Sequence, residues 1–143
     1  MNELDQQILT ALASDSSTPT SQLARRFGVA RSTVQARIGR LEQSGVIAGY
    51  TIKLGNVALA RRIKATALLQ VEPRATAAVL QRMKAIPEIE IAHTASGRFD
   101  LILQIAANST SELDSVLDQI GTIPGVRGSE SLIQLSTKFD RSP

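Results

Sequence analysis

The sequence contains no cysteine, no tryptophan and only one histidine. The absence of cysteine excludes disulfides and thiolate metal sites. Aromatic residues make up 3% of the 143 residues and apolar residues 43%, so any core must be built from aliphatic side chains. No apolar run approaches the roughly 18 residues of a membrane span, and the opening MNELDQQ lacks the features of a signal peptide. We therefore expect a soluble cytoplasmic protein with no membrane partner, made of one domain or two small ones.

Charge is divided unevenly along the chain, whose formal net charge is +3. Residues 1–65 contain nine Lys or Arg against four Asp or Glu, whereas residues 66–143 contain seven against nine. A basic first half attached to a mildly acidic second half predicts that only the first half binds nucleic acid.

Residues 18–49 contain two short helical patterns separated by a glycine. Thr18 followed by Pro19 predicts a helix start, with the hydroxyl as cap and the proline at the first helical position, where its missing N–H costs nothing. Gly28 supplies the permissive backbone of a sharp turn. The apolar residues of the second pattern share one face at i, i+4 and i+7: Val34, Ile38 and Leu41.

The opposite face of this second helix carries small, hydroxyl, amide and guanidinium side chains, which are the groups that read base edges and phosphates in a major groove. Arg31 and Arg37 flank the apolar stripe and would serve phosphate contacts or helix packing. An ordinary solvated face is the alternative. The compact helix–glycine–helix spacing and the segment that follows favour a DNA-binding helix-turn-helix. Its predicted contact residues are Arg31, Ser32, Thr33, Gln35, Ala36, Arg37 and Arg40.

Ser44 and Gly45 end this pattern, and residues 46–54 then read as a short extended segment at the position of a wing. The chain opens on a further helix, in which Asn2 and Asp5 form a capping pair. The three helices are predicted to close around Leu9, Leu12, Leu23, Phe27, Val34, Ile38, Leu41 and Ile47. Residues 55–62 follow neither the helical nor the strand periodicity of apolar residues. They are predicted to be a linker between domains at 1–54 and 63–143.

The second half contains an internal repeat: residues 80–89 match residues 117–126 at an offset of 37. Each copy is the end of an amphipathic helix, an Ile-Pro stop and the start of a strand. Strand patterns at 63–71 and 101–105 precede the two copies. The predicted order is therefore βαββαβ, the ferredoxin-like split βαβ arrangement.

Gly97 lies in the predicted turn between the two middle strands, 88–94 and 99–106. With both helices on one face of the sheet, the other face is left open. Apolar residues exposed there argue for self-association: Leu68, Ile102 and Leu132.

The chain resembles the Lrp/AsnC (feast/famine) family of transcription regulators nearly throughout. The matching stretches are LDQQIL at 4–9, QLARRFGVARSTVQARIGRLEQSGVIAGYTIKL at 22–54, SGRFDLILQI at 96–105 and IPGVRGSESLIQL at 123–135. The resemblance implies an α+β protein with an N-terminal winged helix-turn-helix and a C-terminal ferredoxin-like (RAM-type) effector-binding and oligomerisation domain. It also implies homodimers that bind double-stranded DNA and assemble further into tetramers or octamers. A small effector, typically an amino acid, would modulate this assembly or the affinity for DNA.

Two positions depart from the family pattern. The family usually has Ser where this chain has Ala30, so the cap of the recognition helix is lost, at a cost of about 1 kcal/mol unless a neighbour such as Ser32 compensates. The second departure is Ser131, where the family often has Thr.

The predicted effector site lies in the turn at 94–100, whose glycine lets backbone N–H groups approach a carboxylate. Asp100 lies where the family has its turn aspartate and would accept the ammonium group of an amino acid. The alternative is a plain hairpin in which Asp100 accepts turn N–H groups. The resemblance suggests that a neighbouring subunit adds hydroxyls from the last strand. The predicted residues are Ser96, Gly97, Arg98, Phe99, Asp100, Ser129 and Ser131.

An enzyme is the alternative class, because subunits of siroheme decarboxylases share this architecture and rely on histidines near the tetrapyrrole. In this chain His93 is the only histidine. On a strand its side chain would point to the same face as those of Ile89 and Ile91, which favours a core or interface position. Without cysteine or clustered carboxylates the chain offers no nucleophile with a base and no metal triad. We therefore expect no catalytic residue, no metal and no cofactor other than an effector.

Overall fold

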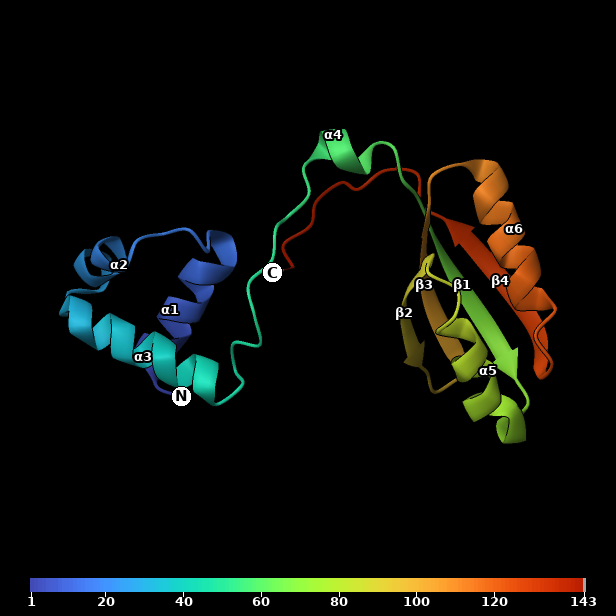
Figure 1. Ribbon diagram of the computed structural model, residues 1–143, viewed down its shortest axis with the longest axis horizontal. Coiled ribbons are helices and arrows are strands. Elements are labelled where there is room, and N and C mark those ends of the chain that lie inside the picture. Colours follow the sequence, from blue (N-terminus) through green and yellow to red (C-terminus); the bar gives the residue numbers. More distant parts are fainter. Residues whose placement is uncertain (143) are drawn as a thin grey trace. The chain divides into compact units, whose positions relative to one another are not determined.

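The computed structural model describes residues 1–142 and divides the chain into two compact units (Figure 1). One unit is Met1–Lys53 together with the C-terminal residues from Asp140 on, and the other is Leu54–Phe139. At the start of the second unit, α4 (Asn56–Leu59) forms a single helical turn within the segment for which the sequence showed no period.

The N-terminal unit consists of α1 (Glu3–Ser14), α2 (Thr20–Phe27) and α3 (Arg31–Gln43). The predicted capping pair at the start of α1 is confirmed. The Asn2 side chain accepts the Asp5 N–H at 3.0 Å, and the Asp5 carboxylate accepts the Asn2 N–H at 3.3 Å. This reciprocal pairing satisfies two of the donors that a helix leaves free at its first turn.

The predicted start of α2 is wrong by one residue. The helix begins at Thr20 with Pro19 as its N-cap, and the Thr18 hydroxyl instead donates to the backbone oxygen of Asp15 at 2.8 Å. The preceding loop captures Thr18, so no side chain caps α2. Its end is as predicted, because Gly28 has a left-handed φ of 67° and closes the helix.

The three helices bury one aliphatic core, as the sequence predicted. Leu23, Val34 and Leu41 are buried, and the other five predicted core residues are half-buried against them. On α1, Ile8 and Ala11 take the innermost positions in place of Leu9 and Leu12.

Residues 46–54 form no strand. The extended segment predicted at the position of a wing follows Gly45, whose φ is 82°, and has no partner strand in the described part of the chain. An extended segment without a partner has no ladder of hydrogen bonds to define it as a strand.

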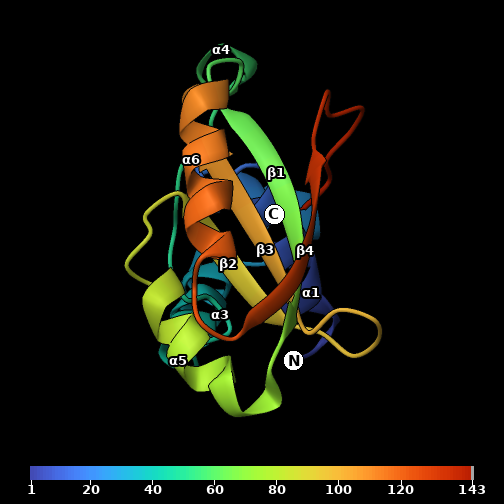
Figure 2. The ribbon, with the colours of Figure 1, turned by 90° about the vertical axis from the view of Figure 1, so that its right-hand side faces the viewer.

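The C-terminal unit confirms the βαββαβ order. Its strands are β1 (Ile63–Val71), β2 (Ile89–Thr94), β3 (Leu101–Ala107) and β4 (Val126–Ile133), arranged β2-β3-β1-β4 with antiparallel pairings throughout. A short 3-10 turn, η1 (Pro73–Ala75), leads into α5 (Thr76–Met83), and α6 (Thr110–Gly121) precedes β4. Both helices cover the same face of the sheet (Figure 2).

The core of this unit lies between the sheet and the two helices. Alternate residues of β1 and β3 point into it, with Leu69, Leu101 and Leu103 fully buried. The predicted helix ends at the two Ile-Pro sequences are also confirmed. Ile86 and Ile123 are buried just beyond the ends of α5 and α6.

The predicted parity of β2 is only partly right, because the strand has an irregularity between Ile89 and Ile91. Ile89 pairs with Ile105 and packs on the core, whereas Ile91 pairs with Gln104 and His93 with Ile102, both on the open face. An extra residue in one strand reverses the alternation beyond it. His93 is therefore an exposed residue of the open face rather than a core residue.

Candidate DNA-binding and effector sites

The outer face of α3 is exposed, as a groove-reading surface requires. Ser32, Gln35, Ala36 and Arg40 are exposed, as is Arg31 at the first helical position, while Thr33 is half-buried. On the other side of the helix, Val34 and Leu41 of the apolar stripe are buried in the core and hold the helix in place. The sequence predicted this division of the helix into two faces.

Arg37 is the predicted DNA-binding residue that the structure places elsewhere. Its guanidinium lies 3.4 Å from the Asp5 carboxylate, and the side chains of the pair are only 24% and 14% exposed. Asp5 thereby serves two purposes, since one of its oxygens completes the cap of α1 and the other binds α3. Arg37 fits the packing role that the sequence left open, by joining α1 to α3.

The start of α3 lacks a side-chain cap, as the sequence predicted. Ala30 has the extended conformation of an N-cap (φ −71°, ψ 149°), and its backbone oxygen accepts from both Thr33 and Val34. Ser32 does not restore the missing cap. The partial positive charge of this helix end therefore faces outward beside Arg31, which favours an anionic partner.

Ala30→Ser is expected to stabilise the N-terminal unit by about 1 kcal/mol, because the backbone at this position already has the conformation that a capping hydroxyl needs. In thermal unfolding, that gain corresponds to a rise of roughly 4–8 °C for a domain of under 100 residues. Ala30→Val is the control, since it adds a side chain without an oxygen. Equal melting temperatures for the two variants would contradict a capping effect.

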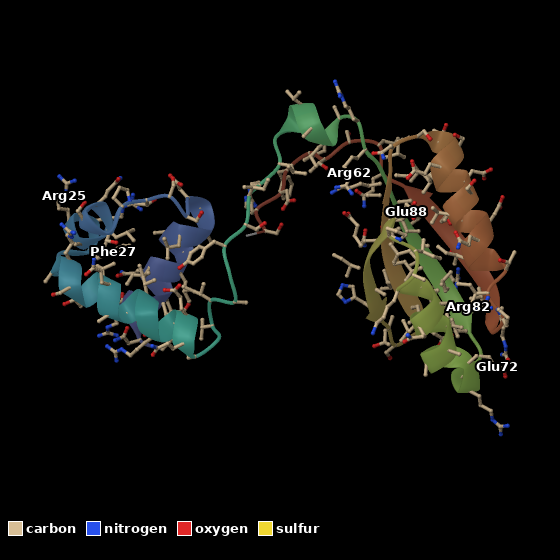
Figure 3. All side chains as sticks on the ribbon, in the orientation of Figure 1. Arg25, Phe27, Arg62, Glu72, Arg82 and Glu88 are labelled. Carbon is tan, nitrogen blue, oxygen red and sulfur yellow. The ribbon has the colours of Figure 1, made fainter. Side chains whose placement is uncertain are left out.

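Arg25 and Arg26, in the last turn of α2, are two further candidate contact residues that the sequence prediction did not include. Both are exposed, neither takes part in an ion pair within residues 1–142, and Arg25 extends outward from its helix (Figure 3). In helix-turn-helix proteins the first helix crosses the phosphate backbone while the second enters the groove. The signal available in the sequence was the Arg-Arg pair directly before the turn glycine.

The turn between β2 and β3 is held against the end of β1. The Asp100 carboxylate accepts the Val71 N–H at 2.8 Å, and the Asp100 N–H donates to the Leu69 oxygen at 2.7 Å. Gly97 has a φ of 133°, a conformation that L side chains rarely adopt. The carboxylate is thus already engaged, although by a β1 amide rather than by the turn amides of the plain-hairpin alternative.

Arg98 and Phe99 extend this turn across the sheet. The Arg98 guanidinium lies 5.1 Å from the centroid of the Phe99 ring and 3.5 Å from the Glu130 carboxylate on β4. The Gln70 amide donates to the Arg98 backbone oxygen at 3.1 Å. The turn therefore contacts both β1 and β4.

The structure does not bring Ser129 and Ser131 to the same face as Glu130. Glu130 pairs with Leu68 on the open face, whereas its two neighbours pair with Leu69 and Ala67, whose side chains point into the core. Alternation along β4 thus directs the two serines away from Arg98. Within one chain, the predicted effector residues form a turn and a separate pair of serines.

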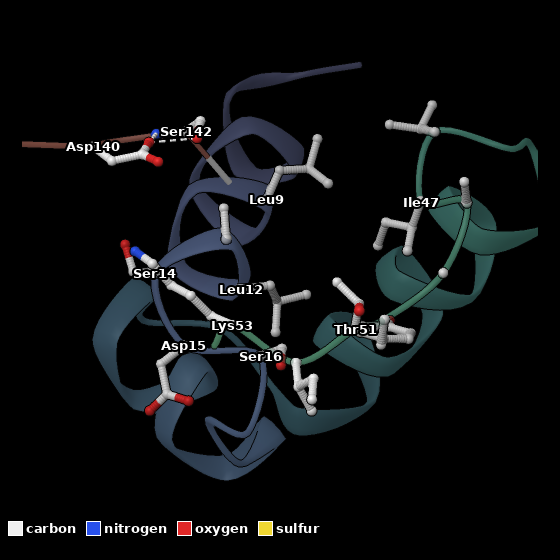
Figure 4. A pocket seen from close by; sticks show the side chains of 16 residues that line it. Leu9, Leu12, Ser14, Asp15, Ser16, Ile47, Thr51, Lys53, Asp140 and Ser142 are labelled. Atoms are coloured by element: carbon white, nitrogen blue, oxygen red, sulfur yellow. Dashed lines mark hydrogen bonds between the residues drawn. The ribbon is translucent and has the colours of Figure 1, made fainter. Parts of the chain in front are cut away.

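A cavity of about 750 Å³ lies in the N-terminal unit (Figure 4). Its walls are the end of α1, the loop at 14–16, residues 46–53 and the side chains of Asp140 and Ser142. None of the predicted DNA-binding or effector residues lines it.

The pKa values of two ionisable groups that line this cavity are shifted. The pKa of Asp15 is lowered, first by the hydrogen bond that its carboxylate accepts from the Ser17 hydroxyl and then by the one that it accepts from the Ser17 N–H. Desolvation, and then the charge of Glu42, raises the pKa of Tyr50. Both shifts leave the ordinary charge states unchanged near neutral pH.

Comparison with known proteins decides the family. Residues 64–143 match the model of the Lrp/AsnC ligand-binding domain, and residues 1–42 match that of the AsnC-type helix-turn-helix domain. The chain belongs to the Lrp/AsnC family. Its two units thus carry the two domains of that family in the usual order.

Relatives in this family are transcription regulators. The chain is 32% identical over 137 residues to the HTH-type transcriptional regulator FL11 of Pyrococcus horikoshii. The aligned residues cover 96% of this chain and 91% of FL11. It is 28% identical to LrpA of Mycobacterium tuberculosis, over 99% of this chain and 95% of LrpA.

Solved structures of the family share the whole fold. The feast or famine regulatory protein of M. tuberculosis, complexed with L-methionine, is 28% identical, with a TM-score of 0.85 over 97% of this chain and 95% of that one. E. coli AsnC, at 24% identity, shares the fold with a TM-score of 0.89 over 100% of this chain and 97% of AsnC.

Within residues 1–142, no group of three or more His, Asp or Glu side chains could hold a metal ion. None of the described helices is long and apolar enough to span a bilayer.

Proposed function

We propose that this Lrp/AsnC protein is a sequence-specific DNA-binding transcription regulator that acts in the cytoplasm and reads a major groove with α3. The observation that carries the proposal is the exposed outer face of α3, which lies beside an uncapped helix start and the two arginines of α2. Selection of binding sites from random duplexes tests it. We expect a pseudo-palindrome with half-sites about one helical turn apart, and affinity that falls with salt.

The proposed dimer forms through the open face of the β-sheet. The helices cover only the other face of the sheet (Figure 2), and apolar side chains of the open face are exposed to solvent. Leu132 is 55% and Ile91 47% exposed, while Leu68 and Ile102 are half-buried between them. Pairing two such faces would bury this surface and relate two α3 helices by a two-fold axis.

The proposed effector is an amino acid bound at the turn of residues 94–100. Gly97 has a positive φ, a conformation that lets backbone N–H groups approach a carboxylate closely. The L-methionine complex of the M. tuberculosis relative supports this ligand class. We propose that Ser129 and Ser131 reach the site from a neighbouring subunit, because in their own chain they point away from Arg98.

Two substitutions separate the two roles that Asp100 could have. Asp100→Asn retains an oxygen that accepts the Val71 N–H but removes the charge, whereas Asp100→Ala removes both. If the carboxylate pairs with the effector's ammonium group, both variants lose the effector response, and only Asp100→Ala also loses thermal stability, by about 1–3 kcal/mol. The measurements are thermal shifts with each amino acid and DNA binding with and without it. A response that is unchanged in Asp100→Asn would restrict Asp100 to holding the turn.

A further inference from the structure

The open face of the sheet carries two complete rows of side chains that cross its four strands. The pairing register gives each row one residue from every strand, in the spatial order β2, β3, β1 and β4. The residues of the first row are Ile91, Gln104, Thr66 and Leu132. The residues of the second row, two positions away on each strand, are His93, Ile102, Leu68 and Glu130.

Both rows have a symmetric pattern of polar and apolar groups. The first row has apolar side chains on the edge strands and polar ones on the central strands, where the Thr66 hydroxyl donates to the amide oxygen of Gln104 at 3.2 Å. The second row is the reverse, with apolar side chains on the central strands, His93 at one edge and Glu130 at the other. Each row therefore reads the same from either edge, except that the donor and the acceptor of the second row change places.

The two polar edge residues are able to bind a further partner. His93 is exposed, and its side chain has no hydrogen-bond or ion-pair partner within residues 1–142. Glu130 lies 3.5 Å from the Arg98 guanidinium, but its side chain is 52% exposed, and a carboxylate accepts several hydrogen bonds. An imidazole donates through a ring N–H in both its neutral and its charged form.

We propose that two copies pack these faces about a two-fold axis parallel to the strands, so that β2 of one copy lies over β4 of the other. The inference rests on the proposed dimer and specifies which strands and residues meet in it. Reversing the strand order places apolar groups on apolar ones, and polar groups on polar ones, throughout both rows. The facing residues are Ile91 with Leu132, Thr66 with Gln104, Ile102 with Leu68, and His93 with Glu130. The last pair forms twice in each dimer, with the imidazole of one copy donating to the carboxylate of the other.

A two-fold axis perpendicular to the strands would place each strand over its own counterpart, and the pattern opposes this arrangement. If that axis ran between the rows, the first row of one copy would face the second row of the other. Every contact would then set a polar side chain on an apolar one, such as Gln104 on Ile102, at a desolvation cost. If the axis ran along the second row, His93 would face His93 and Glu130 would face Glu130, so that two carboxylates repel each other.

Site-specific cross-linking tests which strands meet. The chain has no cysteine, so Ile91→Cys and Leu132→Cys each introduce a single thiol, at an exposed position of an edge strand. We expect a short bis-maleimide to cross-link an equal mixture of the two full-length variants, and to cross-link either variant alone only weakly. Two copies of the same edge strand would lie about three strand spacings apart sideways, roughly 14 Å, in addition to the separation of the sheets. Ala78→Cys, exposed on α5 at the other face, is the matched control and should not cross-link.

Exchange of the edge groups tests the pair formed by His93 and Glu130. His93→Glu sets two carboxylates against each other at both ends of the interface and is expected to weaken dimerisation about tenfold, as measured by sedimentation. His93→Gln keeps a side-chain N–H donor and is the matched control. Adding Glu130→His to His93→Glu exchanges the two groups and is expected to restore the dimer. Circular dichroism verifies that each variant is folded.

The results separate this arrangement from the dimer on which it rests. Cross-linking of either cysteine variant alone, with no gain on mixing, would overturn the packing of β2 over β4 while leaving the dimer in place. Normal dimerisation of His93→Glu, or no recovery in the exchanged variant, would overturn the pair. A wild-type chain that sediments as a monomer at every concentration would overturn the proposed dimer itself.

Discussion

Leu68→Lys is expected to split the dimer and to lower affinity for the operator by about 100- to 10,000-fold, because two linked half-site contacts become two separate ones. Leu68 lies on the central strand β1, between Ile102 on β3 and Glu130 on β4. In the monomer, the new ammonium group can reach water and the Glu130 carboxylate. In the dimer both charged groups would be taken out of water inside the interface, at a high desolvation cost.

The control for this substitution is Leu68→Met, which nearly conserves volume and apolar character. Sedimentation measures the dimer and fluorescence anisotropy measures DNA binding, both at matched protein concentrations. A Leu68→Lys protein that stays dimeric would remove the open face from the interface. A monomeric variant with undiminished affinity would show that the dimer is not needed for operator binding.

Gln35→Ala is expected to cost about 1–3 kcal/mol on the cognate site, which is roughly 5- to 150-fold in affinity, and to relax the base preference at one position. The side chain is exposed on the outer face of α3, and an amide there can bind two atoms of one base edge. The substitution removes this recognition without creating a cavity, so melting temperature should not change. Quantitative binding to a set of single-base variants of the operator is the measurement.

Arg31→Ala provides the contrast to this result. If Arg31 contacts phosphate, its loss weakens all sequences alike and reduces the slope of log affinity against log salt by about one. Arg37→Ala provides a second contrast, because the structure pairs Arg37 with Asp5, and its loss should act first on thermal stability. Unchanged affinity and unchanged preference in Gln35→Ala would mean that a different face of α3 meets the groove.

The sequence by itself determined the features that depend on neighbouring residues. The cap formed by Asn2 and Asp5, the turn at Gly28 and the missing cap at Ala30 each involve residues within about four positions of one another. Strand β1 occupies residues 63–71 as predicted, because strict alternation of apolar residues specifies both the strand and its buried face. The internal repeat then predicted the whole βαββαβ order, because each copy contains the end of a helix and the start of a strand and is preceded by a strand pattern.

Only the tertiary structure decided which partners distant residues have. Asp5 binds Arg37 from another helix, and the Asp100 carboxylate accepts an amide of β1 across 29 positions in sequence. The irregularity in β2 places His93 on the open face, whereas its spacing from Ile89 left a core and an interface position open. These outcomes depend on strand register and helix docking. The free energy of many simultaneous contacts sets both, so no pattern of neighbouring residues could specify them.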